Sequence, residues 1–279
     1  MQIEYKGRIL DLSRPRVMGV VNVTPDSFSD GGRFFKPDAA RAQVLSMLDA
    51  GVDIIDVGGE STRPGATPVS VQQELDRVLP VVELVRRESD VWISVDTSTP
   101  QVMQASAEAG ADLINDVRAL TRDGALSMAA QLDMPVCLMH MQGRPVDMQN
   151  NPQYDDVVAQ VLGYLRERSQ AALGAGVRSA NVLLDPGFGF GKTLAHNLAL
   201  LRALPQLSEL GYPVLVGMSR KSMLGEITGQ PVEHRQAASV AAALLAAQRG
   251  AHIIRVHDVA ETVDALMVLH AVEKGLGET

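Results

Sequence analysis

The sequence predicts an α/β protein, most specifically a (β/α)8 TIM barrel with its active site at the C-terminal ends of the strands. Three observations lead to this prediction: short apolar runs recur, segments with helical periodicity separate them, and eight such runs occur in 279 residues. A barrel of this kind typically needs about 250 residues. We therefore expect one domain over residues 1–279. An open doubly wound sheet is the alternative with the same alternation of elements.

The eight expected strands are rich in Val and Ile and do not alternate polar with apolar residues. Continuous apolar runs are typical of parallel strands, which are buried on both faces. In chain order the strands are Val17–Val23, Ile54–Gly58, Trp92–Asp96, Leu113–Asp116, Val136–Met139, Val182–Asp185, Val214–Val216 and Ile253–Val256.

Six expected helices carry recognisable start or stop signals. Ser70 and Thr99 stand where they can cap the helices that follow them, and glycines follow most of the helices. The six helices are Pro37–Ala50, Val71–Arg87, Pro100–Ala109, Asp155–Leu173, Gln236–Arg249 and Val259–Glu273. Two long connections rich in Gly and Pro, Thr24–Lys36 and Glu60–Val69, follow the first two strands, so both are expected on the catalytic face of a barrel.

The composition excludes several classes of function. The net charge of −8 and an aromatic content of 4% argue against a nucleic-acid partner, which usually requires a basic face and rings for stacking. The single cysteine, Cys137, lies in an apolar run and is expected to be a buried, inert thiol. No apolar stretch is long enough to span a bilayer. We therefore expect a cytoplasmic protein with no membrane contact.

Polar side chains stand where an apolar strand has no structural use for them, at or just after the strand ends. Capping of the following helices explains some of the Asp and Asn residues, but cations are unfavourable near helix N-termini. In a barrel these strand ends meet at one mouth, and the cations there indicate an anionic ligand. The set comprises Asn22, Asp56, Glu60, Asp96, Asn115, Asp116, Asp185, Arg220, Lys221, Ser222, Arg255 and His257.

The chemistry of this set can be outlined from its side chains. Asp185 and Asn115 offer acceptors to a planar heterocycle that carries N–H donors. Arg255 and His257, with Asn22 nearby, are suited to phosphate oxygens, and Mg²⁺ commonly takes phosphate and water oxygens plus one protein oxygen. Ser222 is expected near a helix start, where backbone N–H groups favour a carboxylate or phosphate.

Two other patterns, a glycine-rich run and the histidines, do not indicate a P-loop or a metal site. The glycine-rich run 187–193 follows a strand and resembles a P-loop, but Pro186 occupies the position of the first required glycine and cannot donate an N–H. The six histidines show no metal-ligand spacing. Of these, His140 follows the fifth strand and is either packed or at the mouth, and only His257 is expected in the site.

Several longer motifs resemble those of dihydropteroate synthases and occur in the same order. The resemblance covers the chain from about Asp11 to about Val272, and the motifs show no departure from the family pattern. They are Asn22 to Gly32 (NVTPDSFSDGG), Asp56 to Gly65 (DVGGESTRPG), Ile93 to Thr97, Ile114 to Asp116, Leu184 to Lys192 (LDPGFGFGK), Gly217 to Ser222 (GMSRKS) and Ile254 to Asp258.

The resemblance implies a transferase of folate biosynthesis. Such an enzyme condenses 6-hydroxymethyl-7,8-dihydropterin pyrophosphate with p-aminobenzoate, and is a target of sulfonamides and usually a homodimer. It implies that Asp96, Asn115, Asp185 and Lys221 bind the pterin, with Arg255 covering the ring and reaching the pyrophosphate, and that Gly217 is also a substrate-binding residue. It assigns the pyrophosphate to His257, Thr62, Asn22 and Mg²⁺, with Asn22 as the metal ligand, and the aminobenzoate pocket to Arg63, Pro64, Phe190, Ser222 and Phe28. It also implies that Asp26, Asp96, Lys221 and Arg255 take part in catalysis.

Two alternatives remain at this point. A pterin-dependent methyltransferase would share the Asp and Asn pattern, but it would not need the long first connection, the Arg63-Pro64-Gly65 segment or the Ser-Arg-Lys-Ser segment. A non-catalytic pterin-binding scaffold should have lost the pyrophosphate cations, whereas Lys221, Arg255 and His257 are all present.

Overall fold

The computed structural model describes residues 1–23, 37–61 and 69–275. Within these residues, eight parallel strands form one sheet in the order β8-β7-β6-β5-β4-β3-β10-β9. A parallel bridge between Leu184 and Val214 joins the two edges of the sheet, and the Leu184 N–H donates to the Pro213 carbonyl at 2.9 Å. The sheet therefore closes into the predicted barrel rather than remaining an open doubly wound sheet.

The strand predictions are confirmed to within one residue at each end. Every residue of β4, β6, β7 and β8 is buried, which explains why their sequences are continuous apolar runs rather than alternating ones. The barrel strands are β3 (Arg16–Asn22), β4 (Ile54–Gly58), β5 (Trp92–Asp96), β6 (Leu113–Asp116), β7 (Val136–Met139), β8 (Val182–Asp185), β9 (Leu215–Val216) and β10 (Ile253–Val256).

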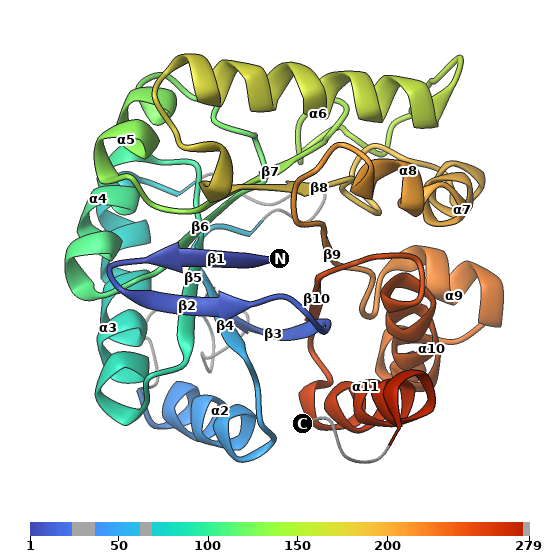
Figure 1. Cartoon of the computed structure of the whole chain (residues 1–279), viewed down its shortest axis with the longest axis horizontal. Helices are drawn as coiled ribbons and strands as arrows, with labels where there is room; N and C mark the ends of the chain where they lie inside the picture. The colour runs from blue at the N-terminus through green and yellow to red at the C-terminus, as the bar shows by residue number, and fades with distance from the viewer. Residues whose placement is uncertain (24–36, 62–68, 276–279) are drawn as a thin grey trace.

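Helices surround the strands (Figure 1) and bury their apolar faces against them. Four helices that the sequence analysis did not delimit, α5, α7, α8 and α9, complete the ring. The described helices are α2 (Pro37–Asp49), α3 (Val71–Glu88), α4 (Pro100–Ala109), α5 (Ala125–Leu132), α6 (Val157–Gly174), α7 (Leu194–Arg202), α8 (Leu204–Ser208), α9 (Ser222–Thr228), α10 (Gln236–Ala247) and α11 (Val259–Lys274), with short 3-10 turns η1 (Ser179–Asn181) and η2 (Val232–His234).

The two predicted caps have different outcomes. Ser70 caps α3 in a full capping box, in which its hydroxyl accepts from the Gln73 N–H. Thr99 precedes α4 but forms no side-chain cap, so that prediction is wrong. Its hydroxyl instead donates to the buried carboxylate of Glu74 at 2.8 Å and accepts from the Arg122 guanidinium, so both of its hydrogen-bonding roles are used away from the helix end.

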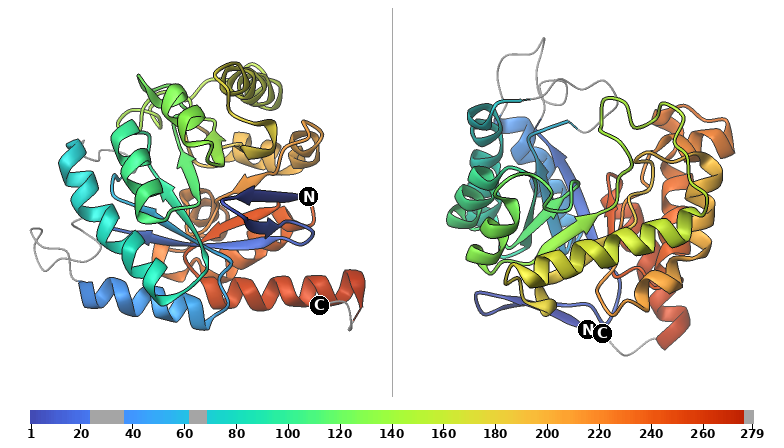
Figure 2. Two further views of the ribbon diagram at one scale, coloured as in Figure 1. Left: turned by 60° about the vertical axis from the view of Figure 1, so that its left-hand side comes forward. Right: turned by 90° about the horizontal axis from the view of Figure 1, so that it is seen from above.

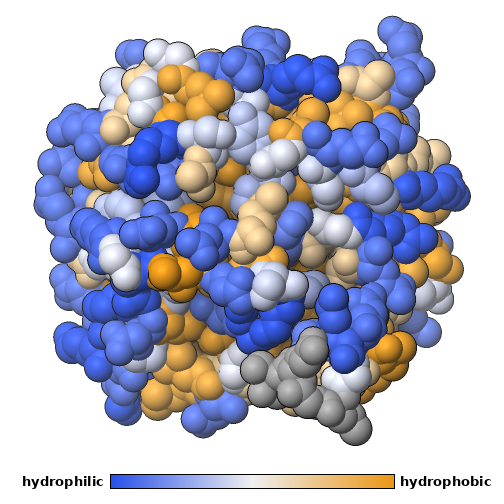
Figure 3. Space-filling model, in the orientation of Figure 1, coloured by the Kyte–Doolittle hydropathy of each residue, from blue (hydrophilic) through white to orange (hydrophobic). Residues whose placement is uncertain are grey.

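An N-terminal hairpin, β1 (Gln2–Tyr5) and β2 (Arg8–Asp11), lies across one end of the barrel (Figures 1 and 2). The sequence predicted no strand before Val17, so this hairpin was missed. The hairpin buries Ile3, Tyr5 and Leu10 against the core. It contacts η1, which immediately precedes β8, so it lies at the N-terminal end of the strands and away from the mouth. The face seen in Figure 3 is largely hydrophilic, with smaller apolar areas between the polar ones.

Two smaller predictions can be compared with the structure. Cys137 is fully buried and free, as expected, and burial raises the pKa of its thiol well above the usual value. Across residues 1–23, 37–61 and 69–275, no helix is both long enough and apolar enough to cross a bilayer.

Candidate active site

The C-terminal ends of β4, β5, β6 and β10 bring four polar side chains into one hydrogen-bonded cluster. Arg255 on β10 reaches across the mouth, with its Nε 2.7 Å from Asp56 Oδ2 and its NH2 group 3.1 Å from Asp96 Oδ2. Asn115 on β6 donates from Nδ2 to the same Asp56 oxygen at 3.5 Å. The predicted residues Asp96, Asn115 and Arg255 are therefore held together through Asp56.

Asp56 is the residue at the centre of this cluster, and the sequence analysis gave it no role of its own. It is fully buried, and it also accepts from the Ser94 hydroxyl at 2.6 Å. Its partner in the parallel register is Ser94 on β5. The available signal was a charged residue inside the apolar run Ile54–Gly58, since such a charge is almost never fully buried unless it is paired.

The cluster holds two carboxyl groups and one guanidinium, and burial together with these charges shifts the pKa of Asp96. Burial raises the pKa of Asp96 to about 7, Arg255 opposes the shift, and Asp56 adds to it. The neighbouring carboxylates raise the pKa of Arg255, although burial acts in the opposite direction. Asp96 can therefore gain or lose a proton near neutral pH, which the sequence alone did not indicate.

A second group forms where the β8 end meets the β9 end. Asp185 Oδ1 accepts from the Gly187 N–H at 2.7 Å. Lys221 Nζ donates to the Phe188 carbonyl and lies 4.6 Å from the centroid of the Phe190 ring. Burial lowers the pKa of Lys221 to about 8, while Asp185 acts to raise it. Three of the predicted site residues, Asp185, Phe190 and Lys221, are thus close neighbours.

The glycine-rich run after β8 is a tight loop rather than a phosphate cradle. Gly187, Gly189 and Gly191 all have positive φ angles, of 68°, 78° and 62°. A Cβ atom on Gly187 would lie 1.9 Å from the His140 carbonyl oxygen, and one on Gly191 would lie 2.3 Å from that of Gln142. These glycines therefore let the loop pack directly on the segment that follows β7.

His257 differs from the expectation that it acts as a cation. Its Nδ1 lies 3.0 Å from the Ser219 hydroxyl, and burial, assisted by Arg255, lowers its pKa to about 4. The imidazole is therefore neutral at neutral pH and can still donate one N–H. Arg220 is not free at the mouth either, because its guanidinium forms an ion pair with Asp258.

The remaining predicted residues on described elements lie at the same end of the barrel. Asn22 is the last residue of β3 and pairs in register with Gly58. Gly217 follows β9, where an added Cβ would lie 3.6 Å from the Arg255 Cβ, at ordinary contact distance. Ser222 is exposed and begins α9, as predicted. Asp26, Phe28, Thr62, Arg63 and Pro64 lie outside the described residues.

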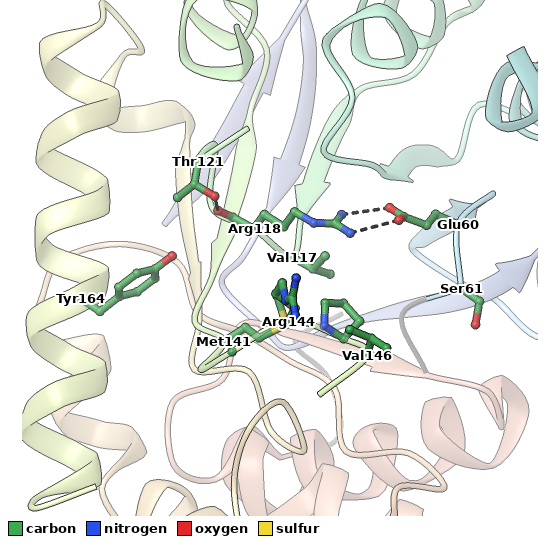
Figure 4. A pocket seen from close by; sticks show the side chains of 11 residues that line it. Glu60, Ser61, Val117, Arg118, Thr121, Met141, Arg144, Val146 and Tyr164 are labelled. Atoms are coloured by element: carbon green, nitrogen blue, oxygen red, sulfur yellow. Dashed lines mark hydrogen bonds and ion pairs between the residues drawn. The ribbon is translucent and has the colours of Figure 1, made fainter. Parts of the chain in front are cut away.

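A pocket of about 390 Å³ lies beside this cluster rather than in it (Figure 4). Arg118 and Glu60 meet on its wall in a two-point ion pair, at 2.9 and 3.0 Å, and Tyr164 of α6 stands on the opposite side. Glu60 was noted at the second strand end, and the structure pairs it with an arginine that the sequence analysis did not single out. Among the described residues, no group of three or more His, Cys, Asp or Glu side chains is arranged to hold a metal ion.

Comparisons with known proteins agree with this geometry. The family model described as "Pterin binding enzyme" matches residues 18–257. Dihydropteroate synthase of Escherichia coli K12 is 54% identical over 271 residues, which cover 97% of this chain and 96% of that protein.

Two solved structures match over nearly the full length. A Yersinia pestis dihydropteroate synthase in complex with a sulfonamide drug is 53% identical, with a TM-score of 0.94 and coverage of 98% of this chain and 99% of that one. A Xanthomonas albilineans dihydropteroate synthase with 4-aminobenzoic acid is 56% identical, with a TM-score of 0.92 and 98% coverage of both chains. Identity at this level, over the whole barrel and its mouth, shows that the chain belongs to the dihydropteroate synthase family of pterin-binding enzymes.

Proposed function

We propose that this chain joins 6-hydroxymethyl-7,8-dihydropterin pyrophosphate to p-aminobenzoate, giving 7,8-dihydropteroate and pyrophosphate. The observation that carries the proposal is the convergence of Asp96, Asn115, Asp185, Lys221 and Arg255 at one barrel mouth, in a chain whose relatives bear this activity in their names. No observation of the structure specifically favours a pterin-dependent methyltransferase or a non-catalytic scaffold over this enzyme.

The pterin ring is the substrate part best matched by buried acceptors. Asp185 and Asn115 are both buried and present oxygens to ring N–H groups, and the Lys221 ammonium can donate to a ring acceptor. When the pterin binds, Asp96 is proposed to accept a hydrogen bond from a pterin N–H in place of the one from Arg255. That exchange would free the Arg255 guanidinium to cover the ring and reach the pyrophosphate.

The pyrophosphate is assigned to Arg255, His257, Thr62 and a Mg²⁺ ion held by Asn22. Asn22 is suited to the metal because it offers a hard oxygen at the mouth, and Gly58 beside it leaves space that a side chain would fill. When bound, Mg²⁺ would neutralise part of the charge that develops on the leaving group. His257, which is neutral in this environment, donates one N–H to a phosphate oxygen.

The reaction is a substitution at the exocyclic methylene carbon of the pterin. The bond from this carbon to the pyrophosphate oxygen breaks, and the neutral arylamine nitrogen forms the new bond and then loses its proton. No strong base is needed, because the amine is already neutral and nucleophilic. Asp96 and Asp26 are proposed to stabilise the electron-poor carbon, and Arg255 and Lys221 the departing negative charge.

The aminobenzoate pocket is assigned to Arg63, Pro64, Phe28, Phe190 and Ser222. Phe190 offers a ring face beside Lys221, and Ser222 offers a hydroxyl at the start of α9. The related Yersinia and Xanthomonas enzymes carry a sulfonamide and 4-aminobenzoic acid in their solved complexes. We therefore expect sulfonamides to compete with p-aminobenzoate here.

The deciding experiment measures pyrophosphate release from the pterin pyrophosphate with Mg²⁺, with and without p-aminobenzoate. Release that requires aminobenzoate and yields dihydropteroate supports the proposal. Pterin binding without turnover would favour a scaffold, and noncompetitive inhibition by a sulfonamide would contradict the pocket assignment. A cytoplasmic location and a homodimeric assembly belong to the same proposal.

A further inference from the structure

Lys192 is a buried lysine at the end of the loop between β8 and α7, and the proposed reaction gives it no role. Only 3% of its surface is exposed, although lysines are rarely buried unless paired. Its Nζ lies 2.9 Å from each of the Gly187 oxygen, the Phe190 oxygen and His140 Nδ1, and 3.4 Å from the His140 oxygen. An ammonium has three donors and no acceptor, so this cage of acceptors fits its protonated form.

The acceptors come from two segments that are far apart in sequence. Gly187 and Phe190 belong to the loop after β8, whereas His140 follows β7. Lys192 therefore fastens the loop to the neighbouring segment, on which the loop glycines already pack without room for side chains. The Tyr154 hydroxyl makes a second attachment to the same loop by donating to the Gly191 oxygen at 2.9 Å.

The other side of the loop faces the candidate active site. The Phe188 carbonyl accepts from Lys221, and the Phe190 ring lies under the Lys221 ammonium. The Gly187 N–H donates to Asp185. Three groups of the proposed pterin and aminobenzoate sites thus take their positions from one short loop.

We propose that Lys192 is a positioning residue, whose buried ammonium clamps the 187–191 loop against the segment after β7 and so sets the places of Phe190 and Lys221. The inference rests on the proposed function, because it uses the aminobenzoate pocket assigned there. The hydrogen bonds of Lys192 are all to the loop and to His140, so it acts through Phe190 and Lys221 rather than on the substrates.

The charges around Lys192 are consistent with this role. Burial lowers the pKa of His140 to about 3, with Lys192 adding to the effect, so the imidazole is neutral and Nδ1 can accept a hydrogen bond. Burial lowers the pKa of Lys192 to about 7, and Asp185 opposes the shift, so the ammonium that these acceptors fit is present below about pH 7 and is lost as the pH rises above it. Removing the ammonium would deprive the Phe190 and His140 carbonyls and the His140 imidazole nitrogen of this donor, while the Gly187 carbonyl keeps the Phe190 N–H at 3.1 Å. The loss of these contacts favours a rearranged loop.

The test compares Michaelis constants in three variants of the full chain. Lys192→Met keeps the length of the side chain and removes its charge, and we expect it to raise the KM for p-aminobenzoate at least tenfold with a smaller change in kcat. Tyr154→Phe removes only the second attachment and should raise the same KM two- to fivefold. Tyr164→Phe is the matched control: its ring also packs on His140, at 5.0 Å between centroids, but among the described residues its hydroxyl makes no hydrogen bond to the loop.

The outcomes separate positioning from general stability. A folded Lys192→Met with a lowered melting temperature and an unchanged KM would overturn the inference, because a purely structural lysine moves only the melting temperature. If Lys192→Met does not fold, Tyr154→Phe and Tyr164→Phe decide the matter, and equal KM values in these two would overturn it. A wild-type chain that makes no dihydropteroate would instead overturn the proposed function.

Discussion

Asp56 and Asp96 share one guanidinium, and this sharing defines the electrostatics of the site at the scale of single residues. Asp56 is fully buried and the Asp96 side chain is 12% exposed, so one Arg255 guanidinium faces two carboxyl groups that are largely removed from water. The pKa of Asp96 is raised from its usual 3.8 to about 7, mainly by burial. Because the folded-state pKa is the higher one, Asp96 favours folding at low pH, and this contribution is lost as the pH rises from about 4 to about 7.

We expect the Asp96 carboxyl to titrate near pH 7 in a carbon-13 NMR experiment on the side-chain carboxyls. Asp96→Asn should abolish the titration near neutral pH. If Asp96 of the wild-type chain titrates below pH 5, the raised pKa is wrong.

A second residue-scale prediction concerns Arg255, which serves both the fold and the ligand. Arg255→Ala should weaken binding of the pterin pyrophosphate by about 2–4 kcal/mol, as the loss of a charge-assisted contact does. It should also lower the free energy of unfolding by about 3–5 kcal/mol, because it leaves the fully buried Asp56 without its cation.

The double variant Arg255→Ala/Asp56→Asn separates these two effects. It removes the unpaired charge, so it should recover much of the lost stability in a thermal melt without recovering affinity in calorimetry. Wild-type affinity in the single variant would exclude Arg255 from the ligand site. Recovery of affinity together with stability would mean that the single variant had bound poorly only because it was unfolded.

At the scale of elements, the barrel strands could be predicted because burial on both faces leaves a continuous apolar run that few other structures produce. The β1–β2 hairpin was missed because four-residue strands give too short an alternation, and charged residues such as Glu4 and Arg8 obscure it. Helices α8 and α9 have only five and seven residues, so they lack the repeats that reveal helical periodicity.

The sequence could predict which strand ends carry the site residues, but not which side chains contact one another. Sequence order indicates that Asp96, Asn115 and Arg255 share a mouth, because strand ends converge in a barrel. It does not indicate that Asp56 joins them, since inward or outward orientation depends on the pairing register. Nor does it indicate that burial keeps His257 neutral, because that depends on the packing around Ser219.

An element-scale prediction follows from the loop after β8. Gly187→Ala combines a positive φ with a Cβ placed 1.9 Å from the His140 oxygen, whereas Gly7→Ala has a similar φ of 76° and nothing within 4 Å. We expect Gly7→Ala to cost about 1–2 kcal/mol of unfolding free energy. Gly187→Ala should cost about 1–3 kcal/mol more, because the backbone must move. Equal losses in chemical denaturation would show that the loop is not packed on His140.

At the scale of the whole molecule, the apolar surface bears on the proposed assembly. Met267, Val268 and Val272 on α11 are 65%, 65% and 79% exposed. Val268 lies three and four residues before Ala271 and Val272, and Met267 lies four residues before Ala271, so these side chains share one side of the helix. Neighbouring α10 adds the exposed Leu245. Large apolar side chains gathered on one surface commonly mark a contact with another chain.

We therefore expect a second copy of the chain to cover the α11 face, with about 800 Å² buried on each partner, as a stable dimer requires. Analytical ultracentrifugation of the wild type should show a dimer, and Val268→Glu/Val272→Glu should shift it to a monomer, because two carboxylates would be buried without partners. Ile9→Glu is the control, since Ile9 is 57% exposed but belongs to β2 and not to α11. A dimer that persists in the double variant would assign the interface to another face, and a monomeric wild type would contradict the assembly itself. Turnover by the monomeric variant would further show that each barrel carries a complete site.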